Sequence, residues 1–129
     1  MLLASLSGCA TAAASGPVVA LPNSYYLQPD KNLQTELVSR SGHRVLDAHV
    51  AAYAVSSQIV AGAVGDVSPK RTYTNELPYT GGPDTRYFIL DTSTGKVESG
   101  LTADAWHSRL KALGVREDFA IYPLLPWQS

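Results

Sequence analysis

Two side chains near the middle of the sequence are of the kind that bind metals or transfer protons. Asp47 and His49 are two residues apart, and Tyr53 follows further along. In a strand, residues two apart point to the same face, so these groups would line up there. His43 could join them if the turn at Ser41–Gly42 folded back. Because a structural zinc site uses about four ligands, we expect instead a solvated polar face of a sheet.

Two further short motifs contain chemically useful residues. Ser41 and His43 could act as a nucleophile and its base, but neighbours within one turn rarely reach the required geometry. Gly81–Gly82 lacks the Lys and the Ser or Thr that complete a phosphate-binding loop. The sequence therefore predicts no catalytic residue, no cofactor site and no metal site.

The single cysteine, Cys9, closes the run Leu6-Ser7-Gly8-Cys9. An aliphatic residue, two small residues and a cysteine resemble the lipobox of bacterial lipoproteins. The resemblance implies that Cys9 is lipidated: a peptidase cuts before it, its thiol takes a diacylglycerol, and its amine can take a further acyl chain such as palmitate. Each buried methylene contributes ~0.8 kcal/mol, so several chains anchor a protein firmly where one would not.

The residues on either side of Cys9 set the expected organisation. Residues 1–8 contain no Lys or Arg and are short for a signal peptide, whose apolar stretch is about 7–15 residues. We therefore expect them to be a truncated lipoprotein signal peptide, with the start codon further upstream or the chain clipped. Residues 9–22 are uncharged and predict a flexible tether with a reach of roughly 20 Å. By the same resemblance, Ala10 and Thr11 indicate an outer membrane, with the protein facing the periplasm.

Composition limits the remaining possibilities. The chain has 129 residues, a formal net charge of −1 and 16% charged residues, against about 25% in typical soluble proteins. Residues 23–129 suffice for a single domain. No basic stripe indicates a nucleic-acid partner, and no apolar run reaches the roughly 18 residues of a membrane span. We therefore expect membrane contact through the lipid anchor and no binding of nucleic acid.

The first half of the domain has the composition of β-strands. Four segments predict strands: 24–28, 34–39, 45–55 and 59–64. The last two are rich in Val, Ile and Tyr and predict an antiparallel hairpin with its turn at residues 56–58. The many alanines leave a helix open as an alternative for Asp47–Ala54, although the β-branched residues favour a strand.

The C-terminal half predicts a hairpin followed by a helix. Segments 87–91 and 96–99 predict strands, and Gly95 can supply the positive φ of their turn. Thr102 is a suitable N-cap, and Gly114 is suited to end the helix. One apolar stripe should face the sheet, formed by Trp106, Leu110 and Leu113. The fold class we expect is α+β, a small and mostly antiparallel sheet of about five to seven strands with one C-terminal α-helix packed on it.

This C-terminal region also carries a family resemblance. Residues 87–97, Ser99 to Thr102, Trp106 and Leu110 to Val115 resemble the C-terminal signature of small bacterial lipoproteins known only as a domain of unknown function. The tyrosine-rich segment 24–28 and the lipobox occur in a similar order. The resemblance implies no catalytic residues.

Between the two halves, residues 65–86 lose all periodicity and contain three prolines. A long irregular segment in a small domain is often functional, because loops on a rigid scaffold carry much of protein binding. Tyrosines offer large contact areas, and nearby cations could meet an acidic or glycan partner. The candidate partner-binding residues are Lys70, Arg71, Tyr73 and Tyr79.

Together these features predict a non-enzymatic lipoprotein of the bacterial cell envelope that binds a protein or another envelope component. Two alternatives stay open. One is an inhibitor or immunity protein that blocks a wall-active enzyme. The other is a small hydrolase or metal-binding protein that uses Asp47 and His49.

Overall fold

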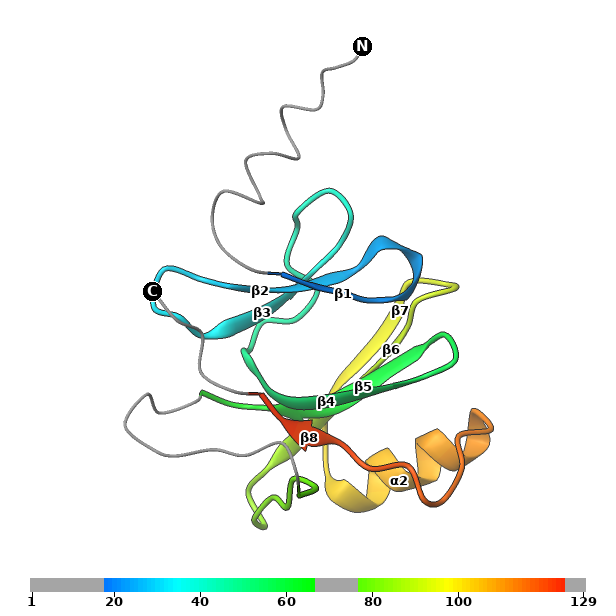
Figure 1. The fold of residues 1–129 in the computed structure, drawn as a ribbon. Coiled ribbons are helices and arrows are strands. Elements are labelled where there is room, and N and C mark those ends of the chain that lie inside the picture. The colour runs from blue at the N-terminus through cyan, green and yellow to red at the C-terminus, as the bar shows by residue number, and fades with distance from the viewer. Residues whose placement is uncertain (1–17, 67–76, 125–129) are drawn as a thin grey trace.

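The computed structural model describes residues 18–66 and 77–124, which form two antiparallel sheets and one α-helix. The smaller sheet covers one face of the larger sheet, and the helix lies against the other face (Figure 1). This arrangement confirms the predicted α+β class with a C-terminal helix packed on a sheet. It differs from the prediction because the strands are divided between two sheets.

The smaller sheet has the strand order β1-β2-β3. Strand β1 (Val19–Ala20) pairs with β2 (Tyr26–Pro29), and β2 pairs with β3 (Thr35–Val38), both antiparallel. A short 3-10 turn, η2 (Pro22–Ser24), joins β1 to β2. Strands β2 and β3 overlap the two segments predicted for this part of the chain.

The folded domain begins before residue 23, where the sequence placed its start. Strand β1 is paired to β2, and Leu21 is buried with the core between the sheets. The last residues of the tether predicted over 9–22 therefore belong to the folded domain. Cys9 lies outside the described residues.

The larger sheet has the strand order β7-β6-β5-β4-β8, with all neighbours antiparallel. Its strands are β4 (Val50–Ser56), β5 (Ile59–Val64), β6 (Arg86–Asp91), β7 (Lys96–Leu101) and β8 (Tyr122–Pro123). Both predicted hairpins are present. The helical alternative for residues 47–54 is wrong, because most of this segment lies in β4. That strand starts at Val50, later than the predicted residue 45.

Two structural details fix the β4–β5 hairpin. Ser56 pairs with Ile59, which leaves a two-residue tip where Ser57 has a φ of 56°; hairpin turns of this length require such a left-handed residue. Further along β5, a Cβ at Gly62 would fall onto the carbonyl oxygen of Ala52 in β4. The two backbones therefore approach closely at this point. The ladder between β4 and β5 is also irregular between Val50 and Ala52.

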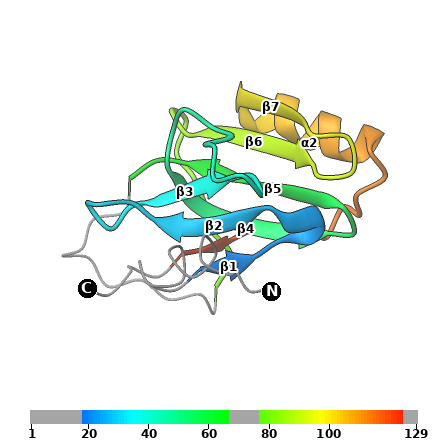
Figure 2. The ribbon, with the colours of Figure 1, turned by 90° about the horizontal axis from the view of Figure 1, so that it is seen from above.

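Two hydrophobic cores lie on opposite faces of the larger sheet. Seen from above, the smaller sheet lies over β4 and β5, and α2 lies near β7 (Figure 2). The core under the smaller sheet includes Leu27, Leu37, Val60, Phe88 and Leu90. The core under the helix includes Ala61, Tyr87, Ile89, Trp106 and Leu110. Because side chains alternate along a strand, β5 and β6 contribute to both cores and are buried on both faces. This explains why their sequences are continuous apolar runs.

Helix α2 (Ala103–Ala112) has the predicted ends. The Thr102 side chain accepts a hydrogen bond from the Ala105 N–H at 3.3 Å. At the C-terminus, Gly114 has a φ of +83°, and the N–H of Val115 donates to the Leu110 carbonyl at 3.0 Å. Together with the bond from the Gly114 N–H to the Lys111 carbonyl at 3.0 Å, this bond forms a Schellman motif. Among the described residues, no helix is long and apolar enough to cross a membrane.

The predicted stripe on α2 is correct for two of its three residues. Trp106 and Leu110 are buried against the sheet. Leu113 is 37% exposed because it is the C-cap residue, at which the helix ends. Val115 is buried with Leu110 in its place, since the turn at Gly114 carries the chain back over the apolar face.

Candidate functional site

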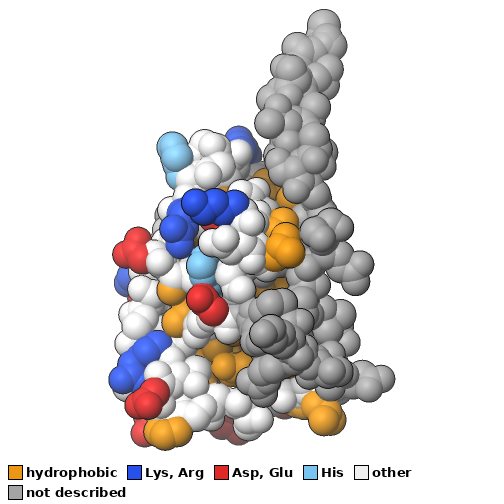
Figure 3. All heavy atoms as spheres, turned by 90° about the vertical axis from the view of Figure 1, so that its left-hand side faces the viewer, with side chains coloured by type: hydrophobic (Ala, Val, Ile, Leu, Met, Phe, Trp, Pro, Cys, Tyr) orange, Lys and Arg blue, Asp and Glu red, His pale blue; other side chains and the backbone are white. Residues whose placement is uncertain are grey.

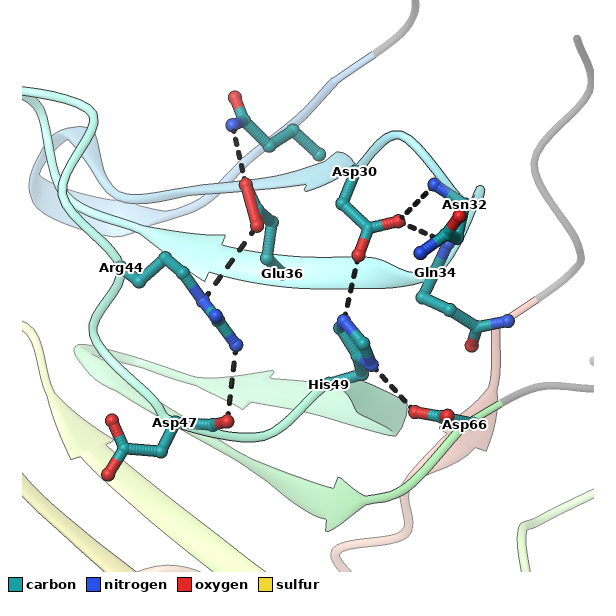
Figure 4. A network of polar contacts seen from close by, with 9 residues as sticks. Asp30, Asn32, Gln34, Glu36, Arg44, Asp47, His49 and Asp66 are labelled. Carbon is teal, nitrogen blue, oxygen red and sulfur yellow. Dashed lines mark hydrogen bonds and ion pairs between the residues drawn. The ribbon is translucent and has the colours of Figure 1, made fainter.

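Asp47 and His49 do not form the predicted pair. Both residues precede β4, in an irregular connection where strand alternation does not apply. The Asp47 side chain points away from His49, and its backbone carbonyl accepts a hydrogen bond from Arg44 at 3.2 Å (Figure 4). Tyr53 packs against the core between the sheets, and burial raises the pKa of its hydroxyl. The predicted face of Asp47, His49 and Tyr53 is therefore not assembled.

His49 instead lies between two carboxylates that the sequence did not single out. Its Nε2 is 2.8 Å from Asp30 Oδ2, and its Nδ1 is 2.6 Å from Asp66 Oδ1 (Figure 4). Asp30 follows β2, His49 precedes β4, and Asp66 follows β5. The three residues therefore connect a turn of the smaller sheet with one end of the β4–β5 hairpin of the larger sheet.

The turn between β2 and β3 holds Asp30 in place. One carboxylate oxygen of Asp30 accepts the backbone N–H groups of Asn32 at 2.8 Å and of Gln34 at 3.0 Å. The other oxygen faces His49. An aspartate that accepts N–H groups a few residues ahead stabilises a turn in this way. Leu33, at the tip, has a φ of 64°, which is an unusual conformation for a leucine.

The charges of this cluster support one another. The hydrogen bond to Asp66 raises the pKa of His49, partial burial lowers it, and Asp30 raises it again, with a net increase. Burial raises the pKa of Asp30, but the N–H groups of Gln34 and Asn32, together with His49, lower it more. His49 is 23% exposed and Asp30 is 18% exposed, whereas Asp66 is 74% exposed. Asp30 is therefore the better shielded partner, and water screens Asp66.

A second polar group lies beside this cluster on the same side of the molecule. Glu36 of β3 accepts a hydrogen bond from Gln28 of β2 at 3.1 Å and lies 3.8 Å from the guanidinium of Arg44. Figure 3 shows a face of mixed character, with basic, acidic and histidine side chains close together and apolar side chains below them. This face carries both positive and negative groups, without a single dominant sign.

The geometry of His49 limits the chemistry that the cluster can do. The imidazole ring separates the two carboxylates, so the three side chains do not converge on one point. Within residues 18–66 and 77–124, no group of three acidic, His or Cys side chains could hold a metal ion. His43 lies elsewhere, in an exposed turn, where its Nδ1 is 3.2 Å from the Ser41 hydroxyl. The cluster is suited to holding segments together and to binding or releasing a proton.

The predicted partner-binding residues fall into two groups. Lys70, Arg71 and Tyr73 lie outside the described residues. Tyr79 is half-buried against the core under the helix, and its N–H donates to the carbonyl of Ile121 at 2.8 Å. Tyr79 lies in an irregular segment, as expected, and its side chain is partly packed against the domain.

A separate hollow of about 170 Å³ lies beside the C-terminal end of α2. It is lined by Leu110, Val115 and Phe119, with His107, Lys111, Arg116 and Glu117 around it. Because α2 covers the face of the larger sheet opposite the smaller sheet, this hollow and His49 are on different sides of the domain. The two features therefore do not form a common site.

Sequence reasoning missed Asp30 and Asp66. A local signal existed for Asp30, because Asp followed by Lys-Asn is typical of a turn between two strands. Nothing local connects either residue to His49, which is distant from both in sequence. Their contact arises only when the smaller sheet packs on the larger one.

Comparison with known proteins identified no relative of this chain. No protein-family model matches the chain, and neither a curated protein nor a solved structure shows significant similarity to it.

Proposed function

We propose that this protein is a lipid-anchored, non-enzymatic binding protein of the bacterial cell envelope. The observation that carries the proposal is the run Leu6-Ser7-Gly8-Cys9, followed by an uncharged segment that leads into the domain. The first strand begins at Val19, so residues 10–18 separate the proposed lipid from the folded part. A segment of this length and composition would let the domain stand clear of the membrane surface.

The architecture is consistent with a binding role. Two sheets and a helix pack around two cores and form a rigid scaffold for the connecting loops. Loops on such scaffolds carry binding disproportionately. Lys70, Arg71, Tyr73 and the half-buried Tyr79 stay the proposed contact residues for a protein or glycan partner.

Metabolic labelling tests the anchor. The native precursor, expressed in a bacterium fed radiolabelled palmitate, should incorporate label and sediment with membranes. Cys9→Ser should abolish both, because the hydroxyl cannot form the thioether. Ser7→Ala keeps a small residue near the cleavage point and serves as the matched control, which should stay labelled. Label that persists in Cys9→Ser, or an unlabelled native precursor, would refute the anchor.

A further inference from the structure

His49 joins three separate segments through its two ring nitrogens. Asp30 belongs to the turn of the smaller sheet, Asp66 follows the end of β5, and His49 leads into β4. The contacts therefore tie the smaller sheet to the larger one at a single imidazole (Figure 4).

The number of protons decides whether both contacts can exist together. A neutral imidazole has one N–H and one lone pair, so it can donate to one carboxylate only. The distances of 2.8 Å to Asp30 and 2.6 Å to Asp66 are those of charge-assisted hydrogen bonds. Both bonds together require the imidazolium form, in which Nδ1 and Nε2 each carry a proton.

Exposure decides which contact is lost when one proton leaves. Asp30 is mostly shielded and is held by the N–H groups of Asn32 and Gln34, so it cannot turn away without disrupting its turn. Asp66 is 74% exposed and can rotate into water. The remaining proton should therefore stay on Nε2, facing Asp30, and Asp66 should separate from the bare Nδ1.

We propose that Asp30, His49 and Asp66 form a proton-operated latch beside the junction of the two sheets. Doubly protonated His49 holds both carboxylates, and the loss of one proton releases the Asp66 side chain at the end of β5 while the contact with Asp30 of the smaller sheet stays. The shift in the pKa of His49 to a higher value agrees with this geometry and places the opening above the ordinary range of imidazole. The inference depends on these three residues and is independent of the lipid anchor.

The other charged groups near His49 do not replace these partners. Glu36 of β3 is engaged with Arg44 and Gln28. The Asp47 side chain, although close in sequence, points away from the ring (Figure 4). Among the described residues, Asp30 and Asp66 are the carboxylates in contact with His49.

The test is a pH titration of the His49 ring nitrogens by NMR, in wild type, Asp66→Asn and Asp47→Asn. In wild type, the midpoint should lie above about 6.5, the value for free imidazole. Above the midpoint the ring should carry its proton on Nε2. Asp66→Asn should move the midpoint to lower pH, because it removes the negatively charged carboxylate that faces Nδ1. Asp47→Asn, the matched control, should leave the midpoint unchanged.

Three results would overturn the latch: an equal midpoint in wild type and Asp66→Asn, an equal shift in Asp47→Asn, or a proton on Nδ1 above the midpoint. The proton position is measured in wild type alone, so it decides the question even if a variant folds poorly. Thermal unfolding of both variants, whose substituted side chains are exposed, checks that they remain native.

Discussion

The indole Nε1 of Trp106 donates a hydrogen bond to the backbone carbonyl of Phe88 at 3.0 Å, in the buried layer between helix and sheet. Phe88 lies where the ladder between β6 and β7 is irregular, between Tyr87 and Ile89. The same indole stacks on Tyr87, with ring centroids 4.8 Å apart. Trp106 therefore fills the core under α2 and also donates a hydrogen bond to a backbone carbonyl of the larger sheet.

This relationship separates two contributions to stability. Trp106→Ala should lower the free energy of unfolding by ~3–5 kcal/mol, the usual cost of removing a large buried aromatic side chain. Trp106→Phe keeps most of the apolar volume but leaves the Phe88 carbonyl without its donor, which costs about 1–3 kcal/mol. Urea denaturation of both variants measures the difference. A Trp106→Phe variant that is as stable as wild type would show that the hydrogen bond contributes nothing beyond packing.

Gly62 is expected to tolerate no side chain. In Gly62→Ala, the new methyl group would collide with the carbonyl of Ala52, so β4 and β5 would have to separate. Overpacking of this kind costs about 1–3 kcal/mol, and more when backbone must move. Gly82→Ala is the matched control, since a Cβ there meets nothing within 4 Å. A thermal midpoint for Gly62→Ala equal to that of the control would contradict the close approach of the two strands.

The dependence of stability on pH follows from Asp30 and His49. The pKa of His49 is raised in the folded state, so its stabilising contribution is complete below about pH 6.5 and is lost as pH rises through the folded pKa. The pKa of Asp30 is lowered, so its contribution is present above its ordinary value of 3.8 and is lost as pH falls through the folded pKa. The pair should therefore stabilise the fold most between about pH 4 and 6.5.

Denaturation of wild type and His49→Gln at several pH values tests this dependence. The stability difference between them should be larger at about pH 5.5 than at about pH 8.5, because the imidazolium of wild type is lost as the pH rises. His107→Gln changes an exposed histidine and is the control for a general effect of losing an imidazole. A difference that grows with pH would contradict the proposed role of protonated His49.

The proposed contact residues can be tested by a triple substitution. Lys70→Ala, Arg71→Ala and Tyr73→Ala together should abolish retention of the envelope component that wild type binds in a detergent extract, with no change in thermal midpoint. The matched control replaces the same residue types elsewhere, at the exposed Lys111, Arg116 and Tyr122. Binding that is lost in the control and kept in the test variant would place the contact surface near α2.

Local signals predicted the elements whose determinants are close in sequence. The helix cap at Thr102, the turn at Gly114 and the hairpin of β6 and β7 each depend on a few neighbouring residues, and all three are present. The predicted start of β4 is wrong because residues 45–49 are apolar enough for a strand but form an irregular connection from the smaller sheet.

Features that depend on packing could not be read from the sequence in the same way. The strand segments do not encode which sheet each strand joins, so the separate three-stranded sheet was not foreseen. The contacts of His49 with Asp30 and Asp66 exist only because that sheet lies on the larger one. Nearness in sequence favours Asp47 as a partner of His49, whereas the partners of His49 in the fold come from distant turns.

Intact mass spectrometry of the protein purified from membranes, after expression of the native precursor, tests the central claim most directly. The proposal predicts a chain whose first residue is Cys9 and whose mass exceeds that of residues 9–129 by a diacylglycerol, with or without an amide-linked acyl chain. Fragmentation should place the lipid on Cys9. A chain that retains residues before Cys9 and carries a free thiol would contradict the assignment of this protein as a lipid-anchored component of the envelope.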